Sequence, residues 1–256
     1  MLESYIRERQ KKKDLLLMTH IVMGYPAFDA CHDMIEQMAA AGVDLMELQI
    51  PFSEPMADGP VILRANQKAL ERGATVAKCM AFAQDMAARY PIPFLFMTYA
   101  NIPFRYGMAA FAKATAGIGL HGTIVPDLPM EEGGEYIQAM QENNLSAIQI
   151  FSPLTGDDRM AKIADTSSGF IYCLARKGVT GADTDLSDTL TRYLARCRKA
   201  ASIPLAVGFG IKDKSDTDFL RGKADIAVIG SQTIRVMEEY GVTAVREFIQ
   251  GLLPAA

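Results

Sequence analysis

The sequence predicts a closed (β/α)8 barrel, and three observations lead to that fold class. Short apolar segments alternate with longer amphipathic ones eight times, which is the pattern of a parallel sheet covered by helices. The chain has 256 residues and 50% hydrophobic residues, enough for eight such units around one core. The glycine-rich fingerprint of the competing open, doubly wound sheet does not follow the first strand. We therefore expect residues 1–256 to form one barrel domain.

Short apolar runs bounded by glycine or proline predict the strands. Gly24-Tyr-Pro26 closes the first run, and Pro51 ends the second because proline has no N–H to donate. The eight strands are expected at 15–22, 44–50, 93–98, 122–125, 146–151, 169–174, 204–207 and 224–229.

Amphipathic segments predict the helices. Within 28–41, for example, Ile35, Met38 and Ala39 recur at helical spacing and form one face. An extra helix over about 2–11 precedes the repeating units, and a short extra helix starts near Ser231. The other helices are expected at 28–41, 62–72, 75–89, from the third strand to about 116, 131–143, 157–165, 187–200, 213–221 and 241–252.

Two carboxylates near the end of the second strand are the acid–base candidates. Glu47 interrupts an otherwise apolar strand, where a carboxylate is costly unless it is paired. Asp58 follows on the next loop, and chemistry in these barrels lies at the C-terminal ends of the strands. We expect Glu47 to exchange protons near neutrality and Asp58 to stay ionised. The alternatives are a structural ion pair for Glu47 and a turn-forming role for Asp58 before Gly59.

The loops after the seventh and eighth strands predict a phosphate site. Gly208-Phe209-Gly210 and Gly230-Ser231 fall there, where such barrels commonly hold phosphate. Glycine lets backbone N–H groups approach the oxygens, and a helix N-terminus adds partial positive charge. The alternative is that these glycines only permit tight turns.

A long loop is expected at Arg176–Asp188, after the sixth strand. It contains Thr180, Gly181 and several small polar residues, a composition typical of a lid. A merely disordered connection is the alternative.

Several of these stretches resemble one known family. The main motif reads Met-Glu-Leu-Gln-Ile-Pro-Phe-Ser-Glu-Pro-Met-Ala-Asp-Gly-Pro over residues 46–60. Further matches occur at Gly24-Tyr-Pro26, over 172–181, at Gly208-Phe-Gly210 and at Gly230-Ser231. Together they resemble the tryptophan synthase α subunit over essentially the whole chain.

This resemblance implies the retro-aldol cleavage of indole-3-glycerol phosphate to indole and glyceraldehyde 3-phosphate. It implies that Glu47 carries the proton transfers, that Asp58 accepts the indole N–H, and that Tyr172 lies near the reacting glycerol. Gly181 would add an N–H to the phosphate site. Thr180 would meet Asp58 when the loop that begins at Arg176 closes.

The resemblance also implies partners. It predicts a β subunit that carries pyridoxal phosphate, within an α2β2 heterotetramer, and no metal or cofactor in this chain. Stand-alone indole-glycerol-phosphate cleavage, another phosphate-binding barrel lyase, and a weakly catalytic subunit that mainly activates β are the alternatives. The aromatic and apolar residues expected to wall the indole site are Phe104, Leu128, Phe151 and Phe209, with barrel core as the other reading for Phe151.

Three positions depart from the family pattern. Gln49 stands where glycine is usual, Glu54 replaces an aspartate on a loop that contacts the partner, and His20 stands where an aromatic ring is common. Strand residues two apart share a face, so Gln49 should lie beside Glu47. We expect its amide to contact that carboxyl, and Gln49→Gly to raise cleavage.

Composition argues against other classes. The net charge is −4, and the short basic stretch over residues 9–13 lacks interleaved aromatics, which argues against nucleic acid. No apolar run approaches the roughly 18 residues of a membrane span, and the first residues are too charged for a signal peptide. Four widely spaced cysteines without a CxxC motif indicate reduced thiols, and we expect a cytoplasmic protein.

Overall fold

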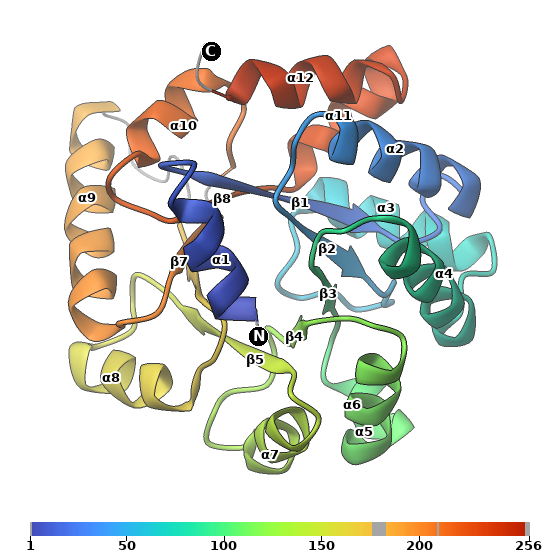
Figure 1. The fold of residues 1–256 in the computed structure, drawn as a ribbon, viewed down its shortest axis with the longest axis horizontal. Coiled ribbons are helices and arrows are strands. Elements are labelled where there is room, and N and C mark those ends of the chain that lie inside the picture. The colour runs from blue at the N-terminus through green and yellow to red at the C-terminus, as the bar shows by residue number, and fades with distance from the viewer. Residues whose placement is uncertain (1, 176–182, 209, 254–256) are drawn as a thin grey trace.

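The computed structural model describes residues 2–175, 183–208 and 210–253, and in these ranges the strands form a closed barrel (Figure 1). Each strand pairs in parallel with its sequence neighbours, and β8 pairs with β1. The predicted (β/α)8 architecture is confirmed. The strands are β1 (Leu16–Val22), β2 (Leu45–Gln49), β3 (Phe94–Met97), β4 (Gly122–Ile124), β5 (Ser146–Phe151), β6 (Ile171–Leu174), β7 (Leu205–Gly208) and β8 (Ile226–Ile229).

Helices surround the barrel and differ from the expected ones in three places. The helix after β3 is split at Gly107, whose φ of 91° is a left-handed conformation that favours glycine. The helix α9 begins at Asp183, earlier than expected, and α11 runs for ten residues rather than being short. The described helices are α1 (Leu2–Gln10), α2 (Phe28–Ala40), α3 (Pro60–Glu71), α4 (Val76–Arg89), α5 (Asn101–Tyr106), α6 (Met108–Gly117), α7 (Gly134–Glu142), α8 (Asp157–Thr166), α9 (Asp183–Ala200), α10 (Lys214–Leu220), α11 (Ser231–Tyr240) and α12 (Ala244–Leu252).

The core has an outer and an inner part. The larger cluster lies between the strands and the helices, and a second cluster fills the inside of the barrel. Leu2 and Ile6 of α1 belong to the inner cluster, so α1 lies across the N-terminal end of the barrel (Figure 1). The inner cluster also contains Leu16, Met18, Leu45, Leu95, Ile124, Ile148, Phe170, Ala206, Ile226 and Val228.

A buried carboxylate fastens this N-terminal end. Asp44, just before β2, is 0% exposed. Its Oδ1 lies 2.6 Å from Arg9 Nη2 and 2.8 Å from Lys13 Nζ, and its Oδ2 accepts the backbone N–H of Leu17 at 3.0 Å. Tyr5 Oη donates to the carbonyl oxygen of Asp44 at 3.1 Å. The charge is therefore compensated by two cations whose side chains still reach solvent.

Candidate active site

A cavity of about 240 Å³ lies at the C-terminal end of the barrel. Side chains alternate along each strand, so every second residue faces inward, and towards the ends of several strands these residues surround the cavity. Ile62 of α3 and Met97 of β3 give it apolar walls. The predicted site residues that line it are Glu47, Asp58, Tyr172, Gly208, Gly210, Gly230 and Ser231.

Glu47 is only 2% exposed and has two unlike oxygens. Its Oε2 lies 2.9 Å from Nδ1 of His20, because the parallel register of β1 and β2 places these two residues opposite each other. Its Oε1 has no hydrogen-bond partner within the ranges that the structure describes. Buried polar atoms are nearly always paired, so an unpaired oxygen on a residue that lines the cavity can take a ligand as its partner.

Asp58 is half-buried on the loop between β2 and α3. Its Oδ2 accepts from Nε2 of Gln49 at 2.7 Å. The neighbouring N–H of Ala57 donates to Oη of Tyr99 at 3.1 Å, and the N–H of Phe52 donates to Oδ1 of Asn66 at 3.0 Å. Side chains from β2, from the end of β3 and from α3 therefore hold this loop over the cavity.

Tyr172 explains why residue 208 is glycine. A Cβ at Gly208 would lie 2.9 Å from Oη of Tyr172, so only glycine leaves room for the phenol. Burial, and then the negative charges of Glu47 and Asp58, raise the pKa of Tyr172 well above its ordinary value. The phenol is therefore a hydrogen-bond donor at neutral pH.

Gly210 and Gly230 differ in backbone conformation and in the space around them. Gly210 has a φ of +84°, a left-handed conformation that favours glycine. Gly230, which precedes the N-terminus of α11, has a φ of −109°, and a Cβ there would make only ordinary contacts, 3.7 Å from Ile62 and 3.8 Å from His20. Neither packing nor a positive φ calls for glycine at 230.

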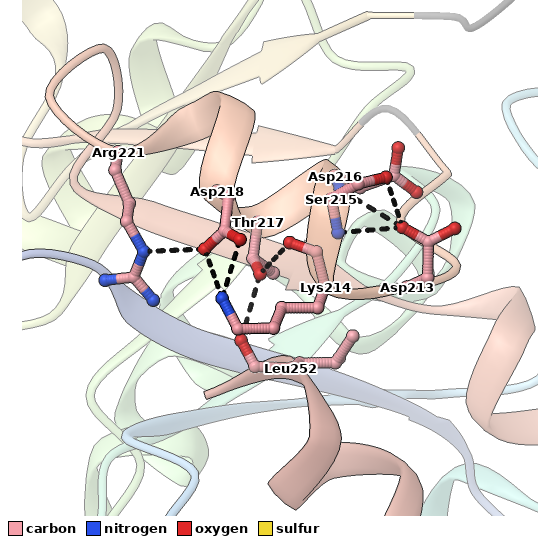
Figure 2. Close-up of polar contacts among 8 residues, drawn as sticks. All are labelled: Asp213, Lys214, Ser215, Asp216, Thr217, Asp218, Arg221 and Leu252. Atoms are coloured by element: carbon pink, nitrogen blue, oxygen red, sulfur yellow. Dashed lines mark hydrogen bonds and ion pairs between the residues drawn. The ribbon is translucent and has the colours of Figure 1, made fainter. Parts of the chain in front are cut away.

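The loop that carries Gly210 is fixed where it enters α10. Figure 2 shows Asp213 at the start of this helix, where its Oδ1 accepts the backbone N–H groups of Ser215 and Asp216 at 2.9 and 3.3 Å. Oδ2 of Asp216 accepts the N–H of Lys212 at 2.8 Å. These bonds cap the helix and hold the end of the loop beside the cavity.

Other predicted residues lie elsewhere. Phe104 is 74% exposed on α5 and does not wall this cavity, so that prediction was wrong. Phe151 is fully buried in the outer part of the core, which agrees with the barrel-core reading given for it. Leu128 lines a neighbouring pocket and not this one. The remaining predicted residues, namely Arg176, Thr180, Gly181 and Phe209, lie outside the described residues, and their roles stay predictions.

Gln49 shares a side with Glu47, as expected, but its amide does not contact that carboxyl. Its Oε1 lies 2.8 Å from Nε2 of His20, and its Nε2 donates to Asp58. Sequence reasoning treated His20 only as a departure from a pattern and missed Tyr99. The sequence did carry a signal for His20, which lies two residues before the end of a strand. It is also separated by an even number of residues from the apolar Leu16 and Met18, which face the inside of the barrel, so it faces inward as well.

None of the helices that the structure describes is long and apolar enough to cross a membrane. Among the same described residues, no group of three or more His, Cys, Asp or Glu side chains could hold a metal ion.

Comparison with known proteins agrees with the resemblance. The family model for the tryptophan synthase alpha chain matches residues 6–251. The chain is 60% identical to the tryptophan synthase alpha chain of Desulforapulum autotrophicum over 252 residues, which cover 98% of this chain and 100% of that protein.

Solved structures show the same fold. A structure of Mycobacterium tuberculosis tryptophan synthase superposes with a TM-score of 0.90 at 29% identity and covers 98% of this chain and 96% of that one. A chain of the tryptophan synthase complex from Pyrococcus furiosus gives a TM-score of 0.85 at 25% identity, with 94% and 98% covered.

Proposed function

Because this chain belongs to the tryptophan synthase alpha chain family and cleaves indole-3-glycerol phosphate in tryptophan biosynthesis, we propose specific roles in that reaction for the residues of its cavity. The reaction needs a proton delivered to C3 of the indole ring. It also needs a proton removed from the hydroxyl of the carbon attached to that ring. The ring becomes cationic in between and must be stabilised at its N–H.

Glu47 carries both proton transfers. The observation that supports this most strongly is its free Oε1, a buried carboxyl oxygen at the cavity wall without a partner among the described residues. A general acid or base must lie within hydrogen-bond reach of the proton that it moves. A carboxyl held through Oε2 and open at Oε1 is fixed in place and still able to reach the substrate.

Asp58 accepts the N–H of the indole ring. Gln49 occupies its Oδ2, and the loop contacts of Ala57 and Phe52 hold it at the cavity mouth. A fixed negative charge that faces the place where positive charge develops lowers the energy of the transition state. Tyr172, which stays protonated, donates a hydrogen bond to the glycerol part of the substrate.

The substrate phosphate lies against Gly208, Gly210, Gly230 and Ser231. The ten-residue helix α11 directs its N-terminus at this place, and a helix N-terminus favours anions. Gly230 supports the assignment because the described residues around it leave room for a Cβ, and glycine there lets phosphate approach its backbone closely.

Substitution of Gly230 tests the phosphate site. Gly230→Val should weaken binding of the substrate and of glyceraldehyde 3-phosphate together, measured as KM and by calorimetry. Gly156, which precedes the N-terminus of α8 and likewise has room for a Cβ, provides the control Gly156→Val. Equal affinities in Gly230→Val and wild type would move the phosphate away from this turn.

The family needs no cofactor in this chain, since pyridoxal phosphate resides in the β subunit, and the solved complexes imply a β partner. We propose that this chain assembles with it as an α2β2 heterotetramer, through a groove of about 620 Å³ at Phe52, Ile102 and Phe104. The exposed Phe104 ring supports this assignment.

Phe104→Ser should weaken association with β in sedimentation, whereas Leu154→Ser, at an exposed residue outside the groove, should not.

Two further assignments complete the proposal. Residues 1–256 act as one domain, which a single cooperative unfolding transition seen by two probes would support. The protein works in the cytoplasm, as is typical of this biosynthetic family. Fractionation of the source cells would test that location.

A further inference from the structure

Three hydrogen bonds connect the two acidic residues of the site in series. Oε2 of Glu47 lies 2.9 Å from Nδ1 of His20, and Nε2 of His20 lies 2.8 Å from Oε1 of Gln49. Nε2 of Gln49 then lies 2.7 Å from Oδ2 of Asp58. We call His20 and Gln49 the connector. Both are buried, with 3% and 0% of their surfaces exposed.

The chemistry of the connector fixes its proton positions. The carboxylate of Asp58 only accepts hydrogen bonds, so the NH2 group of Gln49 must face it and the amide oxygen must face His20. An amide oxygen also only accepts, so Nε2 of His20 must carry a proton. That leaves Nδ1 to share a proton with Oε2 of Glu47.

We propose that His20 and Gln49 are positioning residues for the cleavage reaction: Gln49 fixes the imidazole ring, and His20 holds in reserve the proton that Glu47 delivers. This inference rests on the proposed role of Glu47. The shared proton has two locations, on Glu47 beside a neutral imidazole, or on Nδ1 beside a carboxylate. In both locations, the pair formed by Glu47 and His20 holds the same number of protons.

The proton count of the reaction agrees with this arrangement. The pair gives one proton to C3 of the indole ring, and the bond between C3 and the hydroxyl-bearing carbon then breaks. The hydroxyl loses its proton to Glu47 as that carbon becomes an aldehyde. The pair ends with the proton it began with, and no oxidant or reductant is needed.

The surroundings of His20 favour its charged form. Burial lowers the pKa of His20, but the hydrogen bond and charge of Glu47, the charge of Asp58 and the hydrogen bond with Gln49 outweigh it, so the pKa is raised. Among the described residues that line the same cavity, Tyr172 of β6 is the remaining titratable group. Its phenol stays protonated, so its own titration does not overlap that of the imidazole.

Kinetics of three variants test the connector. Either His20→Phe or Gln49→Met should lower kcat by roughly tenfold to a hundredfold with KM little changed, because misplacing a reacting group by about 1 Å can cost about 10²-fold. The double variant should be about as slow as the slower single variant, since both residues serve one unit. Gln149→Met is the matched control, at another strand glutamine that is only 7% exposed and faces away from this cavity. An unchanged kcat in folded Gln49→Met would overturn the proposal, and so would fully additive losses.

Nitrogen NMR of the imidazole provides a readout that simple loss of packing would not give. In the wild-type protein, Nε2 of His20 should stay protonated throughout the titration. In Gln49→Met the midpoint of His20 should move to lower pH, because the hydrogen bond that raises its pKa is gone. His20→Phe assigns the signal. An identical titration in wild type and Gln49→Met would overturn the proposal.

The NMR measurement needs no substrate, so it separates this inference from the proposed function. Full cleavage activity in Glu47→Gln would refute the role of Glu47, and with it the use of the reserved proton. The ring titration would still show whether Gln49 fixes His20. The two failures are therefore distinguishable.

Discussion

Two buried carboxylates on one strand segment, three residues apart, have opposite surroundings. Asp44 lies at the N-terminal end of the barrel, where Arg9, Lys13 and the N–H of Leu17 occupy its oxygens. Glu47 lies towards the C-terminal end, and within the described ranges its Oε2 bonds to His20 while its Oε1 has no hydrogen-bond partner. Their exposed fractions are nearly equal, at 0% and 2%.

The difference shows that burial alone does not separate a structural carboxylate from a functional one. What separates them is how fully the oxygens are paired. A carboxylate with two cations and a backbone donor stabilises the fold and has little capacity for a ligand. One with a free oxygen costs stability, and this cost is recovered only when a ligand binds. The predictions for Glu47 and Asp44 therefore expect opposite effects at the two ends of the barrel.

The largest effect is expected for Glu47→Gln. Turnover should fall by roughly 10²–10⁴, the usual range for a lost general acid or base. Tm should change much less than in Asp44→Asn, because an amide can still bond to Nδ1 of His20 and, unlike Arg9 and Lys13, the imidazole can give up its charge. The affinity for glyceraldehyde 3-phosphate should change little. Steady-state kinetics and thermal unfolding measure both, with Glu71→Gln, at an exposed residue of α3, as the control. A variant that keeps half the wild-type rate would assign the proton transfers to another group.

Asp58→Asn should lower kcat/KM by roughly 10²–10³, the cost of losing one electrostatic contact to the transition state. The amide has no negative charge to offer the cationic ring. If its NH2 group lies where Oδ2 was, two hydrogen-bond donors face each other, because Gln49 also presents an NH2 group there. The measurement is kcat/KM for substrate beside binding of glyceraldehyde 3-phosphate, which lacks the ring. Weaker binding of that product would mean that the loop has moved.

Asp44→Asn should show the opposite pattern. The free energy of unfolding should fall by about 3 kcal/mol, at the low end for one partner lost from a buried ion pair, because Arg9 and Lys13 can still reach solvent. The activity of the folded fraction should remain at the wild-type value. Urea unfolding and active-site titration check these two statements. A large loss of kcat without a loss of stability would contradict the contrast between the two ends.

The smallest effect concerns pH. The folded pKa of His20 is raised, so the stability that it contributes is present below its unfolded pKa of about 6.5 and is lost as pH rises through the folded value. The difference in unfolding free energy between wild type and His20→Phe should therefore shrink as pH rises. Urea unfolding at several pH values measures it. His32→Phe, on α2, is the control, and a difference that grows with pH would contradict the sign.

Most of the fold could be predicted from the sequence because a parallel barrel repeats one pattern. Each strand is an apolar run that ends at a glycine, a proline or a polar residue, and each helix has one apolar face. The errors arose where one residue decides a boundary. Gly107, with its positive φ, divides a segment that was expected to form one helix, and the identity of the residue alone does not show that conformation.

The site was partly predictable for the same reason. Glu47 and Asp58 could be found because a barrel gathers strand ends at one place. The partners of Gln49 could not, because they depend on the register that sets His20 opposite Glu47 and on where the loop places Asp58. The expected gain from Gln49→Gly is revised accordingly. Removing that amide alone leaves His20 Nε2 and Asp58 without their partner.

The connector also restricts the order in which sequences of this kind can change. His20 without Gln49 has a buried N–H without an acceptor, and Gln49 without His20 has a buried oxygen without a donor. Each of the two residues therefore lowers the stability of the protein until the other is present. A lineage can gain or lose the two together, or through an intermediate that a second change makes tolerable. A designer who moves this site to another barrel must likewise transfer both residues in one step.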